Sequence, residues 1–147
     1  MITDALCLLS DAQALTATAF STNTYDCGNT TPKRRLGDGK PLVVAFQVDV
    51  AADATTGDET YQFDLVTSAN ANLSSPTVLE SVIIARATLA AGFKFNIFWP
   101  QTIPWLRYIG VQYTLGGTTP LLTITAMIQP ADMLQMDQVY AKGYTVS

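Results

Sequence analysis

The sequence predicts an all-β fold, a jelly-roll-like antiparallel sandwich, and three observations support this. Short stretches in which apolar and polar residues alternate recur along the chain, turn-forming residues separate them, and no helix-period segment is long enough to connect parallel strands. Hydrophobic residues make up 48% of the chain and charged residues 14%, a balance that suits a sheet whose solvent face carries Thr, Ser and Asn. We therefore expect about seven or eight strands in one sandwich domain over residues 18–128, with an N-terminal arm at 1–17 and a C-terminal arm at 129–147.

The clearest strands are two alternating stretches in the first half of the chain. Over residues 42–50, the predicted inward face carries Val44, Phe46, Val48 and Val50. Over residues 60–68, the corresponding face carries Tyr61, Phe63 and Leu65. The segment AADATTGDE lies between them and is rich in turn formers, so we expect the two strands to form a hairpin.

Three more alternating stretches follow in the second half. Residues 93–99 alternate up to Pro100, which ends the strand because proline cannot donate to a ladder. Residues 109–115 and 122–128 lie on either side of Gly116-Gly117, which predicts a second hairpin. Weaker patterns predict further strands near 19–26 and within 78–87.

The two ends of the chain do not fit the strand pattern. The segment up to Leu15 is expected to form a helical turn or an extended arm. The segment from Gln129 keeps many apolar side chains for a chain end, which favours docking either on its own sandwich or on a neighbouring subunit.

The composition argues against catalysis. The chain has no histidine, which removes Ser-His-Asp and Cys-His arrangements, an imidazole base and a His-containing zinc site. Asp49, Asp64 and Glu80 are acids on or near strands, and we interpret them as the wet face of a sheet rather than as a glycosidase pair. The acids Asp53, Asp58 and Glu59 lack the spacing of a calcium loop and predict a solvated turn. We therefore expect no enzyme activity, no cofactor and no metal site.

Charge and hydropathy limit the partners. A formal net charge of -4 disfavours nucleic acid, which needs clustered Lys and Arg. No apolar stretch is long enough to span a bilayer and no secretory signal is recognised at Met1, so we expect no membrane partner and folding in a cytosol-like compartment. In such a compartment Cys7 and Cys27 are expected to remain thiols.

Two features are candidates for binding. Lys33, Arg34 and Arg35 form the one dense positive patch of the sequence, which predicts either a solubilising loop or a contact with an acidic protein surface. Trp99, Trp105 and Tyr108 flank two prolines; they predict packing in a core or subunit interface, or exposed rings that stack on a sugar.

Several short motifs resemble the Bbp16-type capsid cement proteins of tailed bacteriophages. The opening is DAQALTATA followed by Ser21-Thr22-Asn23 and by Asp26-Cys27-Gly28. Further similar stretches are LGDGKPL at 36–42, Leu65-Val66-Thr67-Ser68, Leu106-Arg107-Tyr108 and Tyr113-Thr114-Leu115-Gly116. The resemblance covers roughly residues 1–128, and the C-terminal segment shows no matching motif.

The resemblance implies a jelly roll that binds the outside of a phage head and holds neighbouring subunits of an HK97-like major capsid protein together. It also implies a structural virion protein, made in the host cytoplasm, that acts as a dimer or trimer. From composition and expected exposure we take as candidate contacts Asp4, Gln13, Lys33, Arg34, Arg35, Met133, Leu134, Met136 and Tyr140. The alternative is a carbohydrate-binding sandwich of a tail fibre or receptor-binding protein, for which an exposed set of Trp99, Trp105 and Tyr108 is the requirement.

Overall fold

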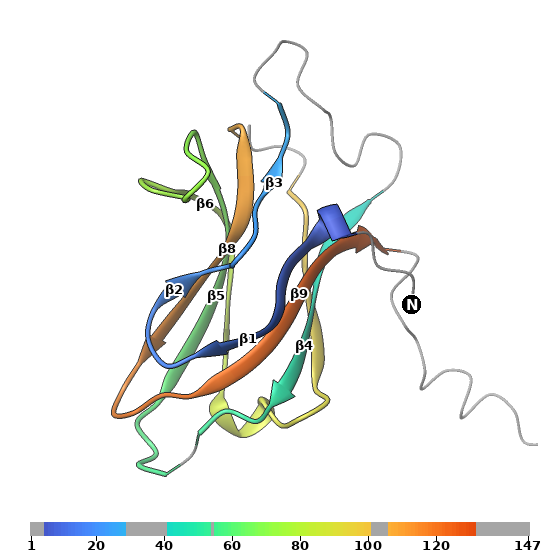
Figure 1. Ribbon diagram of the computed structural model, residues 1–147. Helices are drawn as coiled ribbons and strands as arrows, with labels where there is room; N and C mark the ends of the chain where they lie inside the picture. The colour runs from blue at the N-terminus through green and yellow to red at the C-terminus, as the bar shows by residue number, and fades with distance from the viewer. Residues whose placement is uncertain (1–4, 29–40, 54, 101–105, 132–147) are drawn as a thin grey trace, which may run out of the picture.

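The computed structural model is a sandwich of two antiparallel β-sheets, which confirms the predicted fold class (Figure 1). It describes residues 5–28, 41–53, 55–100 and 106–131. Within these ranges, no helix has the length and apolar character needed to cross a membrane.

Each sheet is built from strands far apart in the sequence. The first sheet has the order β1 (Leu8–Leu15), β9 (Leu122–Pro130), β4 (Leu42–Val50) and β7 (Lys94–Phe98). The second has the order β2 (Ala19–Phe20), β8 (Tyr108–Gly116), β5 (Thr60–Ser68) and β6 (Thr77–Ile84), and β3 (Tyr25–Asp26) also pairs with β8. Short 3-10 turns, η1 (Ala5–Cys7) and η2 (Arg86–Thr88), precede β1 and follow β6.

The strand pairs are nested in the order that defines a jelly roll. Moving inward from the chain ends, β1 pairs with β9, β2 with β8, β4 with β7, and β5 with β6. This is the pairing of one long hairpin that has been rolled into two layers. Apart from the connections β2–β3 and β5–β6, which stay within the second sheet, each connection along the chain crosses from one sheet to the other.

Both predicted hairpins are wrong. β4 pairs with β7 and β9, whereas β5 pairs with β6 and β8, so the segment between β4 and β5 crosses from one sheet to the other. The same holds for the connection through Gly117 between β8 and β9. The two crossings are joined by a hydrogen bond from the Asp53 N–H to the Leu121 carbonyl of 2.9 Å. Turn residues mark where a strand ends, but they do not show whether the next strand pairs with it or faces it across the core.

The alternating faces are predicted correctly at most positions. The inward residues of β5, β8 and β9 lie in one buried core that both sheets share. At its centre Phe46 stacks on Phe95 with ring centroids 4.6 Å apart, and Phe63 meets Tyr113 edge-on at 6.0 Å. Val50 is an exception: it is 49% exposed because the β4 register shifts after Val48, which breaks the period of two.

The N-terminal arm differs from the expectation. Residues 8–15 form β1, an edge strand of the sandwich in which Leu9 and Leu15 are buried. Two register shifts against β9 and a positive φ at Ala12 interrupt the alternation, which is why the sequence pattern does not show a strand there. At the other end β9 runs through Gln129 to Pro130, so the sandwich extends slightly past the predicted boundary at residue 129.

Candidate functional site

Most of the predicted contact residues lie outside the described residues. These are Asp4, Lys33, Arg34, Arg35, Met133, Leu134, Met136 and Tyr140, and the same holds for Trp105. What the structure does give is the position of the described residues that border their segments.

Those bordering residues gather at one end of the sandwich, which we call the arm end. It is bounded by Ala5, Gly28, Pro41, Pro100, Leu106 and Ala131, and it is where β1, β4 and β8 begin and β3, β7 and β9 end. Backbone hydrogen bonds tie it together, from Ala131 N to Pro41 O at 2.9 Å and from Cys27 N to Arg107 O at 2.7 Å. Described residues that are far apart in the sequence therefore lie at the same end of the sandwich (Figure 1).

A charged cluster fixes the second sheet at the arm end. The Arg107 guanidinium donates two hydrogen bonds of 2.9 Å to the two carboxylate oxygens of Asp26 and lies 4.9 Å from the Tyr108 ring centroid. The hydrogen bond to Asp26 raises the pKa of Arg107. Asp26 also accepts the Gly28 N–H at 2.8 Å, so the chain is held where it leaves β3.

The two cysteines, Cys7 and Cys27, are present as thiols and form no disulfide with each other.

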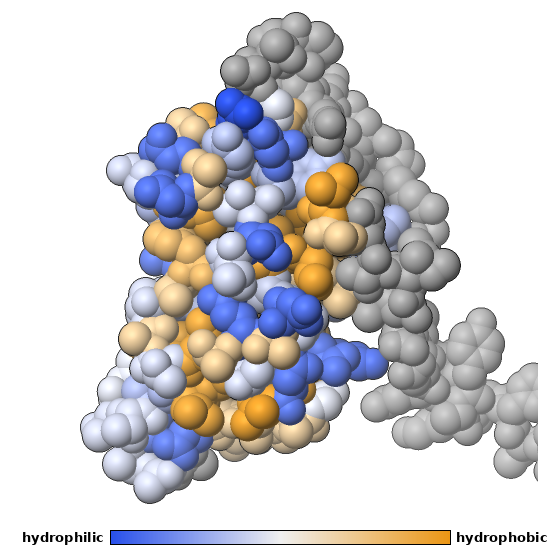
Figure 2. Space-filling model, viewed as in Figure 1, coloured by the Kyte–Doolittle hydropathy of each residue, from blue (hydrophilic) through white to orange (hydrophobic). Residues whose placement is uncertain are grey.

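Two exposed apolar side chains lie at the same end, one in the turn before β1 and one on β7 of the first sheet. Leu6 on η1 is 71% exposed and Phe98 on β7 is 62% exposed. In this part of the first sheet, Leu8 of β1 pairs with Met127 of β9, and Phe98 of β7 pairs with Val43 of β4. Figure 2 shows apolar atoms beside η1 and the end of β9. In the sequence, Phe98 stands at an outward position of the strand predicted over residues 93–99. An aromatic residue at such a position is the signal from which this exposed site could have been predicted.

Gln13, one of the predicted contact residues, is half-buried and forms structural hydrogen bonds, and its contact with a capsid stays a prediction. Its Oε1 atom accepts hydrogen bonds from Ser10 Oγ at 2.7 Å and from the N–H and hydroxyl of Thr22 at 3.1 Å. Its Nε2 atom donates to the Phe20 carbonyl at 2.9 Å. The side chain thus links β1 of one sheet to the β2–β3 segment of the other, and these bonds use its polar groups.

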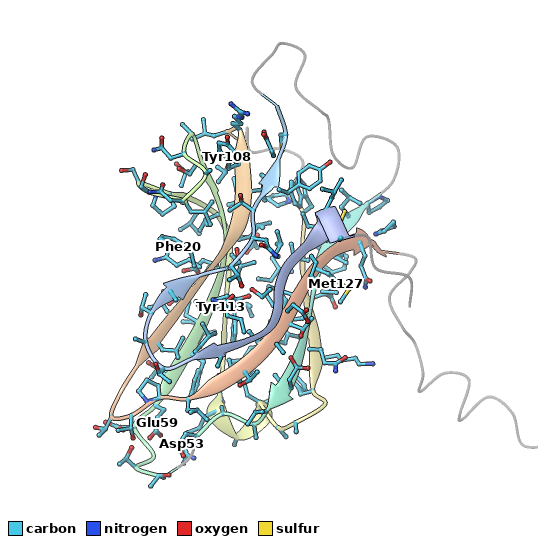
Figure 3. All side chains as sticks on the ribbon, in the orientation of Figure 1. Phe20, Asp53, Glu59, Tyr108, Tyr113 and Met127 are labelled. Carbon is cyan, nitrogen blue, oxygen red and sulfur yellow. The ribbon has the colours of Figure 1, made fainter. Side chains whose placement is uncertain are left out.

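For Trp99, the structure decides between the two predictions, which were core packing and an exposed ring. It is 5% exposed and belongs to the core, because it continues the inward face of β7. Tyr108 is half-buried beside Arg107 (Figure 3). Trp99 therefore cannot belong to an exposed aromatic platform, and the sugar-stacking interpretation loses one of its three rings.

The opposite end of the sandwich carries the acidic loops, with Asp53 and Glu59 near its tip in Figure 3. Asp58 accepts hydrogen bonds from the Thr118 N–H at 3.0 Å and from the Thr118 hydroxyl at 2.9 Å. The bond from the Thr118 N–H is the main cause of the lowered pKa of Asp58. Glu59 accepts the Thr56 hydroxyl and the Gly57 N–H, and its pKa is lowered mainly by the Thr56 hydroxyl. In the described ranges no three acidic or thiol side chains are grouped to share a metal ion. Asp58 and Glu59 therefore accept hydrogen bonds from N–H and hydroxyl groups of the loops at this end.

Two of the strand acids considered as a catalytic pair lie on different surfaces. Asp49 on β4 accepts the Thr125 hydroxyl at 2.6 Å on the outer face of the first sheet. Asp64 on β5 is 4% exposed on the second sheet, where it accepts hydrogen bonds from Gln62 and Ser81. The two carboxylates are on opposite sides of the sandwich, so they do not form a catalytic pair.

Comparison with known proteins gives one family. The model of the Bbp16 family matches residues 9–128, which span β1 through most of β9. No curated protein matches the chain.

Proposed function

Because the chain belongs to the Bbp16 family, we propose that it is a structural virion protein, a capsid cement protein that binds the outer surface of a phage head. In this proposal the arm end faces the shell and contacts neighbouring subunits of an HK97-like major capsid protein. The proposal is supported by the position of the described residues that border the predicted contact segments, which gather at one end of the sandwich next to the exposed side chains of Leu6 and Phe98.

The physical basis of such a function is multivalent binding. When one segment of the protein has bound a capsid subunit, the others are held close to their own sites and bind at a high effective concentration. A protein that contacts several subunits in this way stabilises the assembled shell by the free energy of binding, because it does not bind the dissociated subunits equally well. No group transfer is needed, and a chain without histidine suffices.

Decoration of heads that lack the protein tests the proposal. We expect the triple variant K33S/R34S/R35S to fold normally and to bind heads more weakly than the wild type, with a larger difference at low than at high ionic strength, because salt screens exposed charges. Occupancy is measured by cosedimentation and by cryo-electron microscopy. Lys94→Ser is the matched control, since Lys94 is an exposed cation on β7 outside the arm end.

Two results would contradict the proposal. If the protein is absent from purified virions, it is not a cement protein. If the triple variant occupies heads as fully as the wild type at every salt concentration, the basic residues do not form the contact. Shells without the protein should dissociate at a lower temperature or denaturant concentration than shells that carry it. This result supports the stabilising role.

A further inference from the structure

The connection between β5 and β6, residues 69–76, lies at the arm end, and we call it the β5–β6 loop. β5 ends at Ser68, which pairs with Tyr108 at the start of β8. The Leu106 N–H donates to Thr67 Oγ1 at 2.7 Å, just before the loop begins. Figure 1 shows the loop, in green, at the end of the sandwich where β8 begins. The loop therefore belongs to the surface that the proposed function directs at the shell.

Leu73 anchors this loop on the second sheet. It has no exposed surface, although it belongs to no strand. A Cβ atom added at Gly110 would lie 2.5 Å from Leu73 Cδ1. Gly110 alternates along β8 with the core residues Ile109 and Val111, so it faces the outer side of the sheet. Leu73 thus packs on that outer face, in space that a glycine leaves free.

Hydrogen bonds fix the turn around Leu73. The Leu73 N–H donates to the Asn70 carbonyl at 3.0 Å, and the Ser74 N–H donates to Asn72 Oδ1 at 3.1 Å. Ser68 Oγ donates to the Ser74 carbonyl at 2.6 Å and accepts the Asn70 N–H at 3.1 Å. The last side chain of β5 therefore holds both sides of the turn.

The loop also contains two strained residues. Leu73 has a φ of +59° and Ser75 a φ of +49°, in the left-handed region that residues other than glycine rarely adopt. Such conformations persist where the surrounding contacts enforce them, and they are concentrated in segments that bind or catalyse. The strain favours a binding role for the loop over that of a simple connection.

The exposed side of the loop presents small and uncharged polar groups. Residues 69–72, with the sequence Ala-Asn-Ala-Asn, are exposed, and residues 69–76 include no charged side chain. Asn70 Oδ1 and Asn72 Nδ2 form no hydrogen bond with the other described residues. An amide oxygen accepts and an amide NH₂ donates, so these two groups match the N–H and carbonyl of a partner's backbone.

Exposed aliphatic side chains lie beside these amides. Val78, which pairs with Val66 just after the loop, is 48% exposed, and Leu106, just before β8, is 38% exposed. Apolar side chains next to uncharged polar groups are typical of the centre of a protein interface, where charged residues are depleted.

We propose that the β5–β6 loop is a preformed, uncharged contact of the arm end with a capsid subunit. The amides of Asn70 and Asn72 bind backbone groups of that subunit, and Leu73, packed over Gly110, is the residue that positions them. This inference rests on the proposed function and names a contact within it. Because the loop is already fixed, little conformational entropy is lost when it binds.

Titration of heads that lack the protein, with full-length variants, tests the contact. Ala71→Gln adds a larger uncharged side chain to the exposed loop, and we expect at least about tenfold weaker binding. The loss should be equal at low and high ionic strength, because no charge is changed. Ala91→Gln is the matched control, since Ala91 is an exposed alanine in the connection between β6 and β7 at the opposite end. It should bind as the wild type does.

Gly110→Ala tests the positioning role of Leu73. The new methyl group displaces Leu73, so we expect faster amide hydrogen exchange at residues 70–74 and about fivefold weaker binding to heads. Gly116→Ala is the matched control at the other end of β8, where a Cβ atom would lie 2.6 Å from Thr60 Oγ1. It should leave the exchange and the binding unchanged. Leu73→Ala replaces Gly110→Ala if circular dichroism shows that the latter does not fold.

The double variant Ala71→Gln/Gly110→Ala separates positioning from general destabilisation. If both changes act on one contact, the double variant should bind heads about as weakly as Ala71→Gln alone. Losses that multiply would show that Gly110 acts on binding independently of the loop, which contradicts the positioning role.

The outcomes distinguish the loop contact from the proposed function. A wild type that does not bind heads overturns both. A wild type that binds heads, with Ala71→Gln binding equally well, overturns the loop contact and leaves the proposed function standing. A loss in Ala71→Gln that changes with ionic strength contradicts an uncharged contact.

Discussion

Tyr113 and Ser10 illustrate how single residues hold the two sheets in position. Tyr113 lies on β8 with no exposed surface, and its hydroxyl forms a 2.7 Å hydrogen bond with Ser10 Oγ on β1 of the other sheet. Burial raises the pKa of the Tyr113 phenol, so the group is a neutral hydroxyl at physiological pH. Ser10 in turn donates to Gln13, so a buried polar chain crosses from sheet to sheet.

We predict that Tyr113→Phe and Ser10→Ala each destabilise the fold by about 1 kcal/mol, the usual net contribution of an internal hydrogen bond. Urea unfolding of both single variants and of the double variant measures the free energy of unfolding. Because the two residues share one bond, the double variant should lose less than the sum of the singles. Strictly additive losses would show that the bond contributes nothing.

Among the elements, the connections β4–β5 and β8–β9 decide how the strands are distributed between the sheets. Gly117 has a φ of +91°, and a Cβ atom at that position would lie 2.5 Å from the Asp58 carbonyl oxygen. Asp58 receives two hydrogen bonds from Thr118, so the two connections are packed against each other. The carboxylates at this end therefore stabilise both crossings together.

We predict that acid weakens this end of the sandwich. The folded pKa values of Asp58 and Glu59 are lowered by hydrogen bonds from Thr118 and Thr56. Their contribution to stability is therefore present above the unfolded pKa values, 3.8 for Asp58 and 4.5 for Glu59. It is lost as the pH falls through the lower folded values. Thermal unfolding between pH 6 and pH 2 measures this, and Asp58→Asn should flatten the dependence. An equally steep fall in that variant would assign the effect to other acids.

For the whole molecule, the jelly roll places different chemistry on different surfaces. The arm end carries Arg107, Leu6 and Phe98, the opposite end carries Asp53, Asp58 and Glu59, and the β6 edge carries Ile83. In the proposed function, only the arm end faces the shell, so the other two surfaces stay available to solvent or to other contacts.

We predict that Phe98→Ser lowers the affinity for heads by about tenfold or more, the loss expected when a partly buried aromatic contact is removed from an interface. The affinity is measured by titration of heads with the full chain. Val50→Ser removes a comparably exposed apolar side chain from the opposite end, so it should bind as the wild type does. Equal losses in the two variants would mean that Phe98 has no special contact.

Features that depend on neighbouring residues in the sequence were predicted better than features that depend on contacts between distant parts of the chain. The strands β4, β5, β8 and β9 and most of their buried faces follow from the alternation of the sequence, because a side chain's face depends on its own position in the strand. The sequence left Trp99 between a core position and an exposed one, and did not show that Gln13 links the two sheets, because both depend on what packs against a residue from elsewhere in the chain. The residues predicted at 33–35 and 133–140 lie outside the described ranges and stay predictions.

The sequence by itself determined the all-β class, the main strands, the inward faces of the core and the family, because these depend on local period and motif. Only the tertiary structure decided that β4 and β5 face each other instead of pairing, that residues 8–15 form a strand, and that described residues far apart in the sequence lie together at the arm end. The physical reason is that a turn residue fixes the direction of a few bonds, whereas strand partners are selected by the burial of both sheets against one another.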